Sequence, residues 1–431
     1  MKINYILAVL AFIPFSTNAQ TSQYLEEYRS KVKEYNQDIR SASLASQICD
    51  EKQKIAKADF LPSLSGNANF NHVGNPSELT LNIPSLSDPM TFKGKDIQYG
   101  ASLTLAQPLY SGGAIKAGYD KAKKENELSQ HEMRRITNNI MYDADVYYWN
   151  KVARQEMTDV AKDFKKSVAV LVNVVKHRVD EGYTDRNDLL MVEVKLNDAE
   201  YQLIQATNNE EIARMSLNSF SGVSFQETVP TDSIVIPLKE EHSYAGCIAS
   251  AMSARPEMQI ATGKIDIQKS TAKIANSQYL PKLSVGFDGS YSSPGYNFRS
   301  DLDPNYAVYA KLSVPIFEWG KRRNTRKAGK YSVDMAVENQ KKVADNVRLE
   351  IETALYNYSQ AVRKVNLTES SLSKAAESEQ LAIDKYREGN ISIVEVINAQ
   401  IYHLDAKVNY IQSKLNAQIA KSGLERAMGS I

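Results

Sequence analysis

Four short segments of the chain alternate apolar and polar residues, the pattern of a strand with one face turned to an apolar environment. In the clearest of them Val285, Phe287 and Tyr291 share one face, and serines with Asp288 occupy the other. About ten alternating residues is the length of a membrane-spanning strand, although edge strands of soluble β-sandwiches alternate too. The four segments are residues 64–72, 98–105, 283–292 and 306–314.

Long stretches without proline predict very long helices after each pair of segments. No proline occurs in the 121 residues that follow Pro108 or in the 116 that follow Pro315, and proline breaks helix interiors. Apolar residues recur at spacings of four and three in both stretches, as on one face of a helix. Gly182 and Gly389 interrupt them, so each stretch is expected to form a helical hairpin with a tight turn at the glycine. Shorter helices are expected at residues 24–58 and 243–277.

The two halves of the chain superpose at a constant offset of 207 residues. Gly182 matches Gly389 and Gly222 matches Gly429, without a gap over the 115 residues that begin at Pro108. Paired helices of fixed span would forbid insertions here, whereas a loop-rich enzyme would tolerate them. We therefore predict an internal duplication, with residues 20–222 as the first structural repeat, 223–242 as a connector and 243–431 as the second structural repeat.

The first repeat carries 12 more residues between its two strands than the second, because Pro62 matches Pro281 at an offset of 219. The extra residues can be placed between His72 and Asp96, where asparagine, proline, glycine and aspartate predict a loop.

The start of the chain indicates secretion. Lys2, an apolar run from Ile6 to Phe15 and the small residue Ala19 predict a signal peptide over residues 1–19. No later stretch approaches the roughly 20 apolar residues of a membrane-spanning helix, so a secreted chain of this kind would enter a membrane only as a closed β-barrel. Four strands cannot close around an aqueous lumen, and an open sheet leaves unpaired edges. The chain is therefore expected to oligomerise if these strands cross a membrane.

Charge and candidate chemistry argue against an enzyme. Without Lys2 the chain has 51 basic and 51 acidic residues, so it has no bulk attraction for nucleic acid. The five histidines lack metal-ligand spacing, and no nucleophile or phosphate-loop motif occurs; no cofactor or metal is expected. Residues 301–305 resemble part of a calcium loop but lack its glycine and glutamate, which favours a plain loop. Cys49 and Cys247 occupy non-equivalent positions and are interpreted as separate core residues, with a disulfide as the alternative.

The most specific motif spans residues 385–400 and reads Lys-Tyr-Arg-Glu-Gly-Asn-Ile-Ser-Ile-Val-Glu-Val-Ile-Asn-Ala-Gln. It is similar to the turn motif of the outer-membrane efflux protein family, the TolC-like channels. Residues 178–193 form a looser first copy. Arg-Pro-Glu at 255–257 and Pro-Ile-Phe-Glu-Trp-Gly at 315–320 are also typical of the family. The resemblance covers essentially the whole chain after the signal peptide.

The resemblance implies a mainly α fold, with a long α-helical barrel in the periplasm and four strands per chain. A homotrimer would close these strands into a twelve-stranded β-barrel in the outer membrane. The implied partners are outer-membrane lipid, a periplasmic adaptor (membrane fusion) protein and, through it, an inner-membrane transporter. The implied task is passive efflux of small molecules. Two alternatives stay open: the outer-membrane component of a type I polypeptide secretion system, and a periplasmic coiled-coil adaptor, which typically has one helical hairpin rather than two.

The two helical turns are the candidate periplasmic entrance. Asp188 and Glu395 are equivalent in the two repeats; in a trimer each would form a ring of carboxylates that favours cations, and plain solvation of charged turns is the alternative. The resemblance makes Tyr386 a residue that locks the closed entrance. Ile391 stands where the family has a basic gate partner, and Asn398 replaces a common acidic residue, so an aliphatic constriction is also open. The exposed turn residues expected to contact an adaptor are Gly182, Tyr183, Gly389 and Asn390, with Ile391 beside them.

Cations and aromatic residues gather where the strands meet the helices. Four cations just after the last strand segment are candidates for contact with lipid phosphates, and a solvated helix start is the alternative. Aromatic residues near the strand ends suit the interfacial belts of a membrane protein, or packing in a core. The cations are Arg322, Arg323, Arg326 and Lys327, and the aromatic residues are Tyr99, Tyr306, Phe317 and Trp319.

Overall fold

A computed structural model describes residues 22–82, 84, 88–233, 235, 252, 254–295 and 301–430. The predicted signal peptide, Cys247 and most of the second half of the connector lie outside these residues. The chain divides into two compact units. The first comprises Met1–Arg40, Ile136–Ala251 and Leu349–Ile431, and the second comprises Ser41–Arg135 and Met252–Arg348. Each unit therefore takes segments from both predicted repeats.

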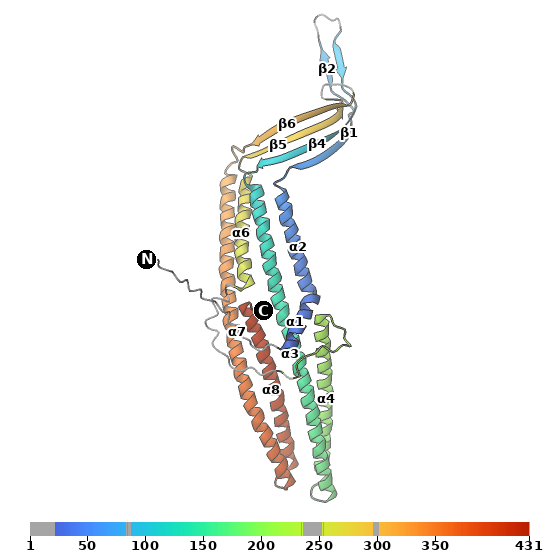
Figure 1. The fold of residues 1–431 in the computed structure, drawn as a ribbon, viewed down its shortest axis with the longest axis vertical. Coiled ribbons are helices and arrows are strands. Elements are labelled where there is room, and N and C mark those ends of the chain that lie inside the picture. Colours follow the sequence, from blue (N-terminus) through green and yellow to red (C-terminus); the bar gives the residue numbers. More distant parts are fainter. Residues whose placement is uncertain are drawn as a thin grey trace, which may run out of the picture. The chain divides into compact units, whose positions relative to one another are not determined.

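Helices dominate the described residues, as the proline-free stretches predict (Figure 1). The two longest have 67 residues each and the helices that follow them have 36 each. Both lengths repeat at the 207-residue offset. The helices are α1 (Gln23–Tyr35), α2 (Gln37–Ala58), α3 (Ala114–Asp180), α4 (Arg186–Ser221), α6 (Pro256–Ser277), α7 (Lys321–Arg387) and α8 (Ile393–Met428). None of the helices in the described part of the chain combines the length and the apolarity needed to cross a membrane.

The helix expected over residues 24–58 is in fact two helices, α1 and α2, because Asn36 interrupts it. The side chain of Asn36 accepts hydrogen bonds from the backbone N–H groups of Asp38 at 2.9 Å and Ile39 at 3.3 Å. These bonds satisfy donors at the start of a new helix, which is the usual role of an N-cap asparagine. Cys49 lies on α2 as a half-buried free thiol rather than in a core.

The four alternating segments form one antiparallel sheet in the second unit, in the order β1-β4-β5-β6. The strands are β1 (Ser63–His72), β4 (Ile97–Tyr110), β5 (Lys282–Ser293) and β6 (Asp303–Ser313). In their register Leu64 pairs with Leu105, Leu105 with Phe287, and Phe287 with Val308. Directly paired residues share a face, so the apolar positions of all four strands form one apolar face.

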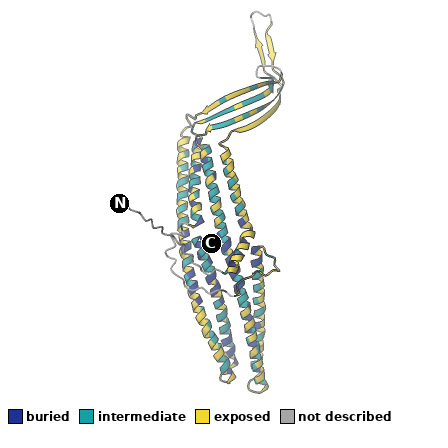
Figure 2. Ribbon diagram, in the orientation of Figure 1, coloured by how far each residue is buried: buried dark blue, intermediate teal, exposed yellow. Residues whose placement is uncertain are grey.

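Most residues of this apolar face are exposed in the single chain, and the others are half-buried (Figure 2). Along β4 the apolar residues are exposed while the polar residues between them are only half-exposed. Leu103 is 58 % exposed, Val308 76 % and Tyr306 74 %. A soluble sheet buries its apolar side chains, so the pattern is inverted here.

Composition predicts that the insertion between β1 and β4 is a loop, but part of it forms strands. It contains a two-stranded hairpin of β2 (Glu78–Leu81) and β3 (Met90–Lys93), paired antiparallel. Glu78 pairs with Lys93, and their side chains form an ion pair at 3.5 Å. The prolines and glycine of this segment flank the two short strands, and composition alone did not reveal the four-residue strands between them.

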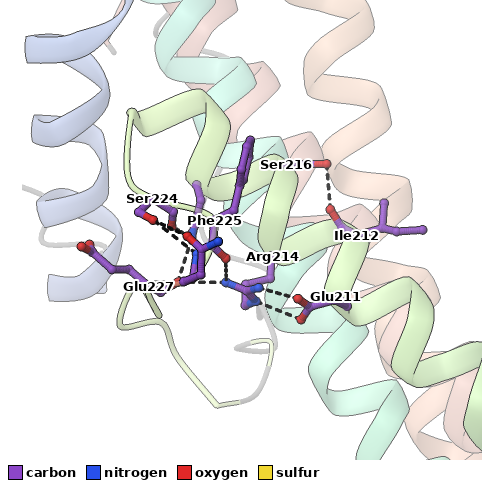
Figure 3. Close-up of polar contacts among 9 residues, drawn as sticks. Glu211, Ile212, Arg214, Ser216, Ser224, Phe225 and Glu227 are labelled. Carbon is purple, nitrogen blue, oxygen red and sulfur yellow. Dashed lines mark hydrogen bonds and ion pairs between the residues drawn. The ribbon is translucent and has the colours of Figure 1, made fainter.

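The first part of the connector folds back on the end of α4 (Figure 3). Arg214 is held by Glu211, one turn before it on α4, through an Nε–Oε2 bond of 2.9 Å. Its guanidinium also donates to the carbonyl oxygens of Phe225 and of Glu227, the latter at 3.0 Å. Asn218 donates to the same Glu227 carbonyl at 2.8 Å. These bonds fix the chain direction after α4.

The connector then packs into the core of the first unit. Val229 and Val235 are buried with the side chains of α3. Lys151 of α3 donates to the Thr231 hydroxyl at 2.8 Å, and Tyr148 donates to Asp232 at 2.8 Å. The described part of the connector is thus an integral part of this unit.

One buried ion pair joins α1 to α3 within the first unit. Arg29 binds Asp145 through two bonds, Nε–Oδ1 at 2.7 Å and Nη2–Oδ2 at 2.6 Å. The Asp145 side chain is fully buried, and Tyr28 beside it is buried with its hydroxyl on the Leu217 carbonyl at 3.1 Å. Burial raises the pKa of the Tyr28 hydroxyl, and the charges of Tyr147 and Asp145 add to this. The geometry is the bidentate form that such pairs need when they are buried.

We expect Asp145→Ala to lower the free energy of unfolding of the first unit by about 3 kcal/mol, because Arg29 would lose its buried partner. Thermal unfolding of the purified chain measures the change. Asp159→Ala is the control, because Asp159 lies on the same helix in an exposed pair with Lys162 and should cost under about 0.5 kcal/mol. Equal losses in the two variants would contradict a structural role for the buried pair.

Candidate functional site

Two matching turns join the helices of the two hairpins. Gly182 has φ 78° and Gly389 has φ 82°, a left-handed conformation that glycine adopts without strain. The N–H of Tyr183 bonds to the carbonyl of Arg178 at 2.8 Å, and that of Asn390 bonds to Lys385 at 2.9 Å. The N–H of Gly182 bonds to the carbonyl of Val179 and that of Gly389 to Tyr386, each at 3.0 Å, which completes a Schellman motif at the end of α3 and again at the end of α7. Both turns therefore end their helices by the same mechanism.

The predicted adaptor-contacting residues of these turns are exposed. Gly182, Gly389 and Asn390 are all exposed, and Tyr183 is 72 % exposed. Apart from its two chain neighbours, no described residue has a heavy atom within 4 Å of the position that a Cβ on Gly182 would take. A large exposed aromatic side chain at a helix turn is available for contact with a partner.

The two predicted acidic ring residues each make a local contact at the start of a helix. Asp188 accepts a hydrogen bond from the Thr184 hydroxyl. Glu395 accepts from the backbone N–H of Ser392 at 3.3 Å and from its hydroxyl at 3.2 Å, as in a capping box. A carboxylate in the first turn also interacts favourably with the helix dipole. These contacts account for an acidic residue at both positions within a single chain.

Tyr386, the predicted locking residue, lies in a small apolar core between the two hairpins. It is 4 % exposed and packs with Val175, Val192 and Val396. Burial raises the pKa of its hydroxyl, the Arg178 guanidinium lowers it, and the nearby Asp188 carboxylate raises it again. In this chain Tyr386 is therefore held as a neutral, packed side chain.

Arg178, the first residue of the looser motif copy at 178–193, ties the end of α3 to the end of α7. Its guanidinium lies 4.9 Å from the centre of the Tyr386 ring. Its Nη1 donates to the carbonyl oxygens of Tyr386 at 2.9 Å and Arg387 at 3.2 Å. These are carbonyls at a helix C-terminus, where a cation is favoured. The sequence does show a basic residue in the last turn of both long helices, which points to a role at a helix end. It does not show that Arg178 reaches the end of the other hairpin's helix.

The remaining two predicted gate residues differ in environment. Ile391 is half-buried and packs against the core around Tyr386, while Asn398 is exposed on α8. Within one chain Ile391 thus contributes to packing.

A cavity of about 320 Å³ opens beside Tyr386, between α3, α7 and α8. Gln400 lines it and is 2 % exposed, and its Nε2 donates to the Ser167 hydroxyl at 3.0 Å. This bond joins α8 to α3. Gln400 is the last residue of the motif at 385–400, so the motif singles out this residue. It does not predict the contact with Ser167.

A further polar pair joins α7 to α8 near the turns. His403 Nδ1 is bonded to the Glu379 carboxylate, and both side chains are 16 % exposed. Among the residues that the structure describes, no three His, Cys, Asp or Glu side chains are arranged to hold a metal ion.

Comparison with known proteins agrees with the family resemblance of the sequence motifs. A family model described as "Outer membrane efflux protein" matches residues 28–223 and 247–430. The pyoverdine export outer membrane protein OpmQ of Pseudomonas putida is 19 % identical over 333 residues, 77 % of this chain and 70 % of that protein. The alkaline protease secretion protein AprF of Pseudomonas aeruginosa is 25 % identical over 231 residues, 52 % of this chain and 47 % of that protein.

Solved structures confirm the predicted fold class. A crystal structure of CusC superposes with a TM-score of 0.80 at 16 % identity and covers 95 % of this chain and 93 % of its own. At this identity the similarity establishes the fold, which in the described residues is mainly helical with one four-stranded sheet and a separate two-stranded hairpin.

We expect Arg178→Ala to loosen the end of α7, because the carbonyls of Tyr386 and Arg387 would lose a charged donor. Hydrogen exchange of the backbone amides in the last turn of α7 should rise about tenfold, the equivalent of one lost charge-assisted bond. Lys385→Ala is the matched control, since Lys385 is exposed at the equivalent position and should leave the exchange unchanged. No difference between the two variants would show that Arg178 does not hold this end.

Proposed function

Since the chain belongs to the outer membrane efflux protein family, we propose how it forms the outer-membrane channel of an efflux system: three copies close one pore. The chain is an outer-membrane channel subunit, with its helical barrel in the periplasm. The family consists of channel proteins rather than enzymes. A channel needs a polar lumen and an entrance that opens, and we assign each of them to a part of this chain.

The observation that carries the proposal is the exposed apolar face of the four-stranded sheet. Its opposite face bears serine, threonine and asparagine, and β1 and β6 each have one edge that no other strand of the sheet covers. In lipid an unpaired backbone edge costs several kcal/mol for each unsatisfied group. Pairing β6 of one copy with β1 of the next removes both edges. Three copies then give twelve strands, enough to enclose a water-filled lumen with the apolar faces toward lipid.

The helical hairpins continue this arrangement into the periplasm. Their equal lengths let both hairpins of each copy end at one level, so that three copies present six turns at the entrance. Exposed Tyr183, Gly182, Gly389 and Asn390 would meet a periplasmic adaptor there, and an inner-membrane transporter would act through that adaptor. Asp188 and Glu395 would form carboxylate rings around the opening. Arg178 and Tyr386 would hold the hairpins together when the entrance is closed, with Ile391 and Asn398 next to them.

Small molecules are the proposed cargo. The pyoverdine export protein matches most of this chain, whereas the protease secretion protein matches about half of it. A wide aqueous tunnel discriminates loosely by size and charge, so the pump rather than this chain would select the substrate.

Reconstitution in planar bilayers tests the proposed pore. The purified chain should produce long-lived conductance steps, each from one trimer, with a preference for cations. Preparations that contain trimers but never conduct in either the presence or absence of an adaptor would contradict the proposal.

We expect the double variant Asp188→Asn with Glu395→Gln to reduce the cation preference, because the amides keep an acceptor for Thr184 and Ser392 but remove the charge. The double alanine variant should reduce it equally. Reversal potentials in a salt gradient measure the effect. If only the alanine variant changes selectivity, the carboxylates act as helix caps; if neither variant does, the proposed rings are absent.

A further inference from the structure

The segments that connect the four sheet strands to the helices all lie at one end of the sheet. β1 and β5 begin there and β4 and β6 end there, because Ser63 pairs with Ala106 and Lys282 with Ser313. Helices α2 and α6 end just before β1 and β5 at this end, and α3 and α7 begin there just after β4 and β6. The residues that leave β6, from 314 to 320, therefore lie at a defined level, next to one border of the apolar face.

Three large apolar side chains at this level are exposed. Ile316 is 94 % exposed, Phe317 70 % and Trp319 87 %, and the rings of Phe317 and Trp319 meet edge to face at 5.0 Å. Because these side chains are exposed, packing within this chain does not explain why they are large and apolar. Aromatic side chains of this kind are typical of the border between hydrocarbon and headgroups.

Trp319 also has an unfavourable backbone conformation. Its φ of 45° lies in the left-handed region, which bulky residues rarely adopt. The equivalent residue of the first repeat, 207 positions earlier, is Gly112, with φ 65°. Glycine adopts this conformation freely. The second repeat therefore keeps a tryptophan at a position where the backbone favours glycine, and apart from its contact with Phe317 the side chain is little buried in this chain.

The start of α7 carries an unusual concentration of positive charge. Six of its first ten residues are lysine or arginine, and its first turn contains no acidic residue. Cations at a helix N-terminus oppose the helix dipole. The first ten residues of α3, at the equivalent place, have three lysines and one aspartate. The charge is therefore no requirement of this strand-to-helix junction.

Four of these cations cover one side of the first two turns. Arg322 and Arg326 are four residues apart, as are Arg323 and Lys327, so each pair lies along one side of the helix. All four are exposed, and none is ion-paired with another residue in the part of the chain that the structure describes. The nearest acidic residue in the sequence is the half-buried Glu318.

We propose that Arg322, Arg323, Arg326 and Lys327, with Phe317 and Trp319 beside them, bind the phosphate headgroup of anionic phospholipid in the leaflet that faces the helices. The guanidinium groups supply paired donors for phosphate oxygens, and the two rings occupy the headgroup border. The bound phosphate offsets both the helix dipole and the mutual repulsion of the cations. The inference rests on the proposed membrane position of the sheet and adds a lipid preference to it.

Reconstitution of the full chain tests the site, in vesicles of phosphatidylcholine alone and of phosphatidylcholine mixed with phosphatidylglycerol. After extraction in mild detergent, native mass spectrometry counts the lipids that remain bound. The wild type should retain phosphatidylglycerol in preference to phosphatidylcholine, and less so at high salt. The variant R322Q/R323Q/R326Q/K327Q should lose this preference by roughly tenfold or more, since each cation near an anionic surface contributes about fivefold.

Two further variants separate charge from folding. R322K/R323K/R326K keeps the charge and should keep most of the preference. K341Q/K342Q/R348Q/R363Q removes four exposed cations further along α7 and should keep all of it. Equal retention of both lipids by the wild type, or an unchanged preference in the quadruple glutamine variant, would overturn the lipid site. Failure of the wild type to float with vesicles of either composition would instead contradict the proposed membrane position.

Discussion

The backbone hydrogen-bonding groups along the two outer edges of the sheet constrain everything else in this chain. A four-stranded sheet with one apolar face can enter lipid only if both edges find partners, and the chain contains no further strand in its described part that pairs with them. Identical copies are the simplest source, because β1 and β6 are present in each. The inverted exposure along β4, apolar outward and polar half-covered, fits the same environment.

Equal helix lengths follow from the same requirement. If copies join edge to edge, both hairpins of every copy contribute to the same helical barrel. Hairpins of different length would then end at different distances along that barrel. α3 and α7 have the same number of residues, as do α4 and α8. The single large insertion falls between β1 and β4, where β2 and β3 form a separate hairpin that leaves the sheet register intact.

Much of this fold was accessible from the sequence, because period-two alternation, proline-free stretches and turn glycines are local signals. The contacts that join the helices of the two hairpins were not. Arg178 reaches carbonyls more than two hundred residues away, and Gln400 reaches Ser167; periodicity places a residue on a face but does not identify its partner. The local sequence does not distinguish Asn36 from other polar helix residues, whereas its capping bonds do. The roles of Asp188, Glu395, Ile391 and Asn398 depend on neighbouring copies, so a single chain explains only their local packing and capping.

The stoichiometry of the chain in its membrane tests this account most directly. Native mass spectrometry of the full-length protein, extracted from outer membranes in mild detergent, should give the mass of three chains, with few monomers. A monomer that fractionates with soluble periplasmic proteins would contradict the account, because its sheet edges would then have no partner and its apolar face no lipid.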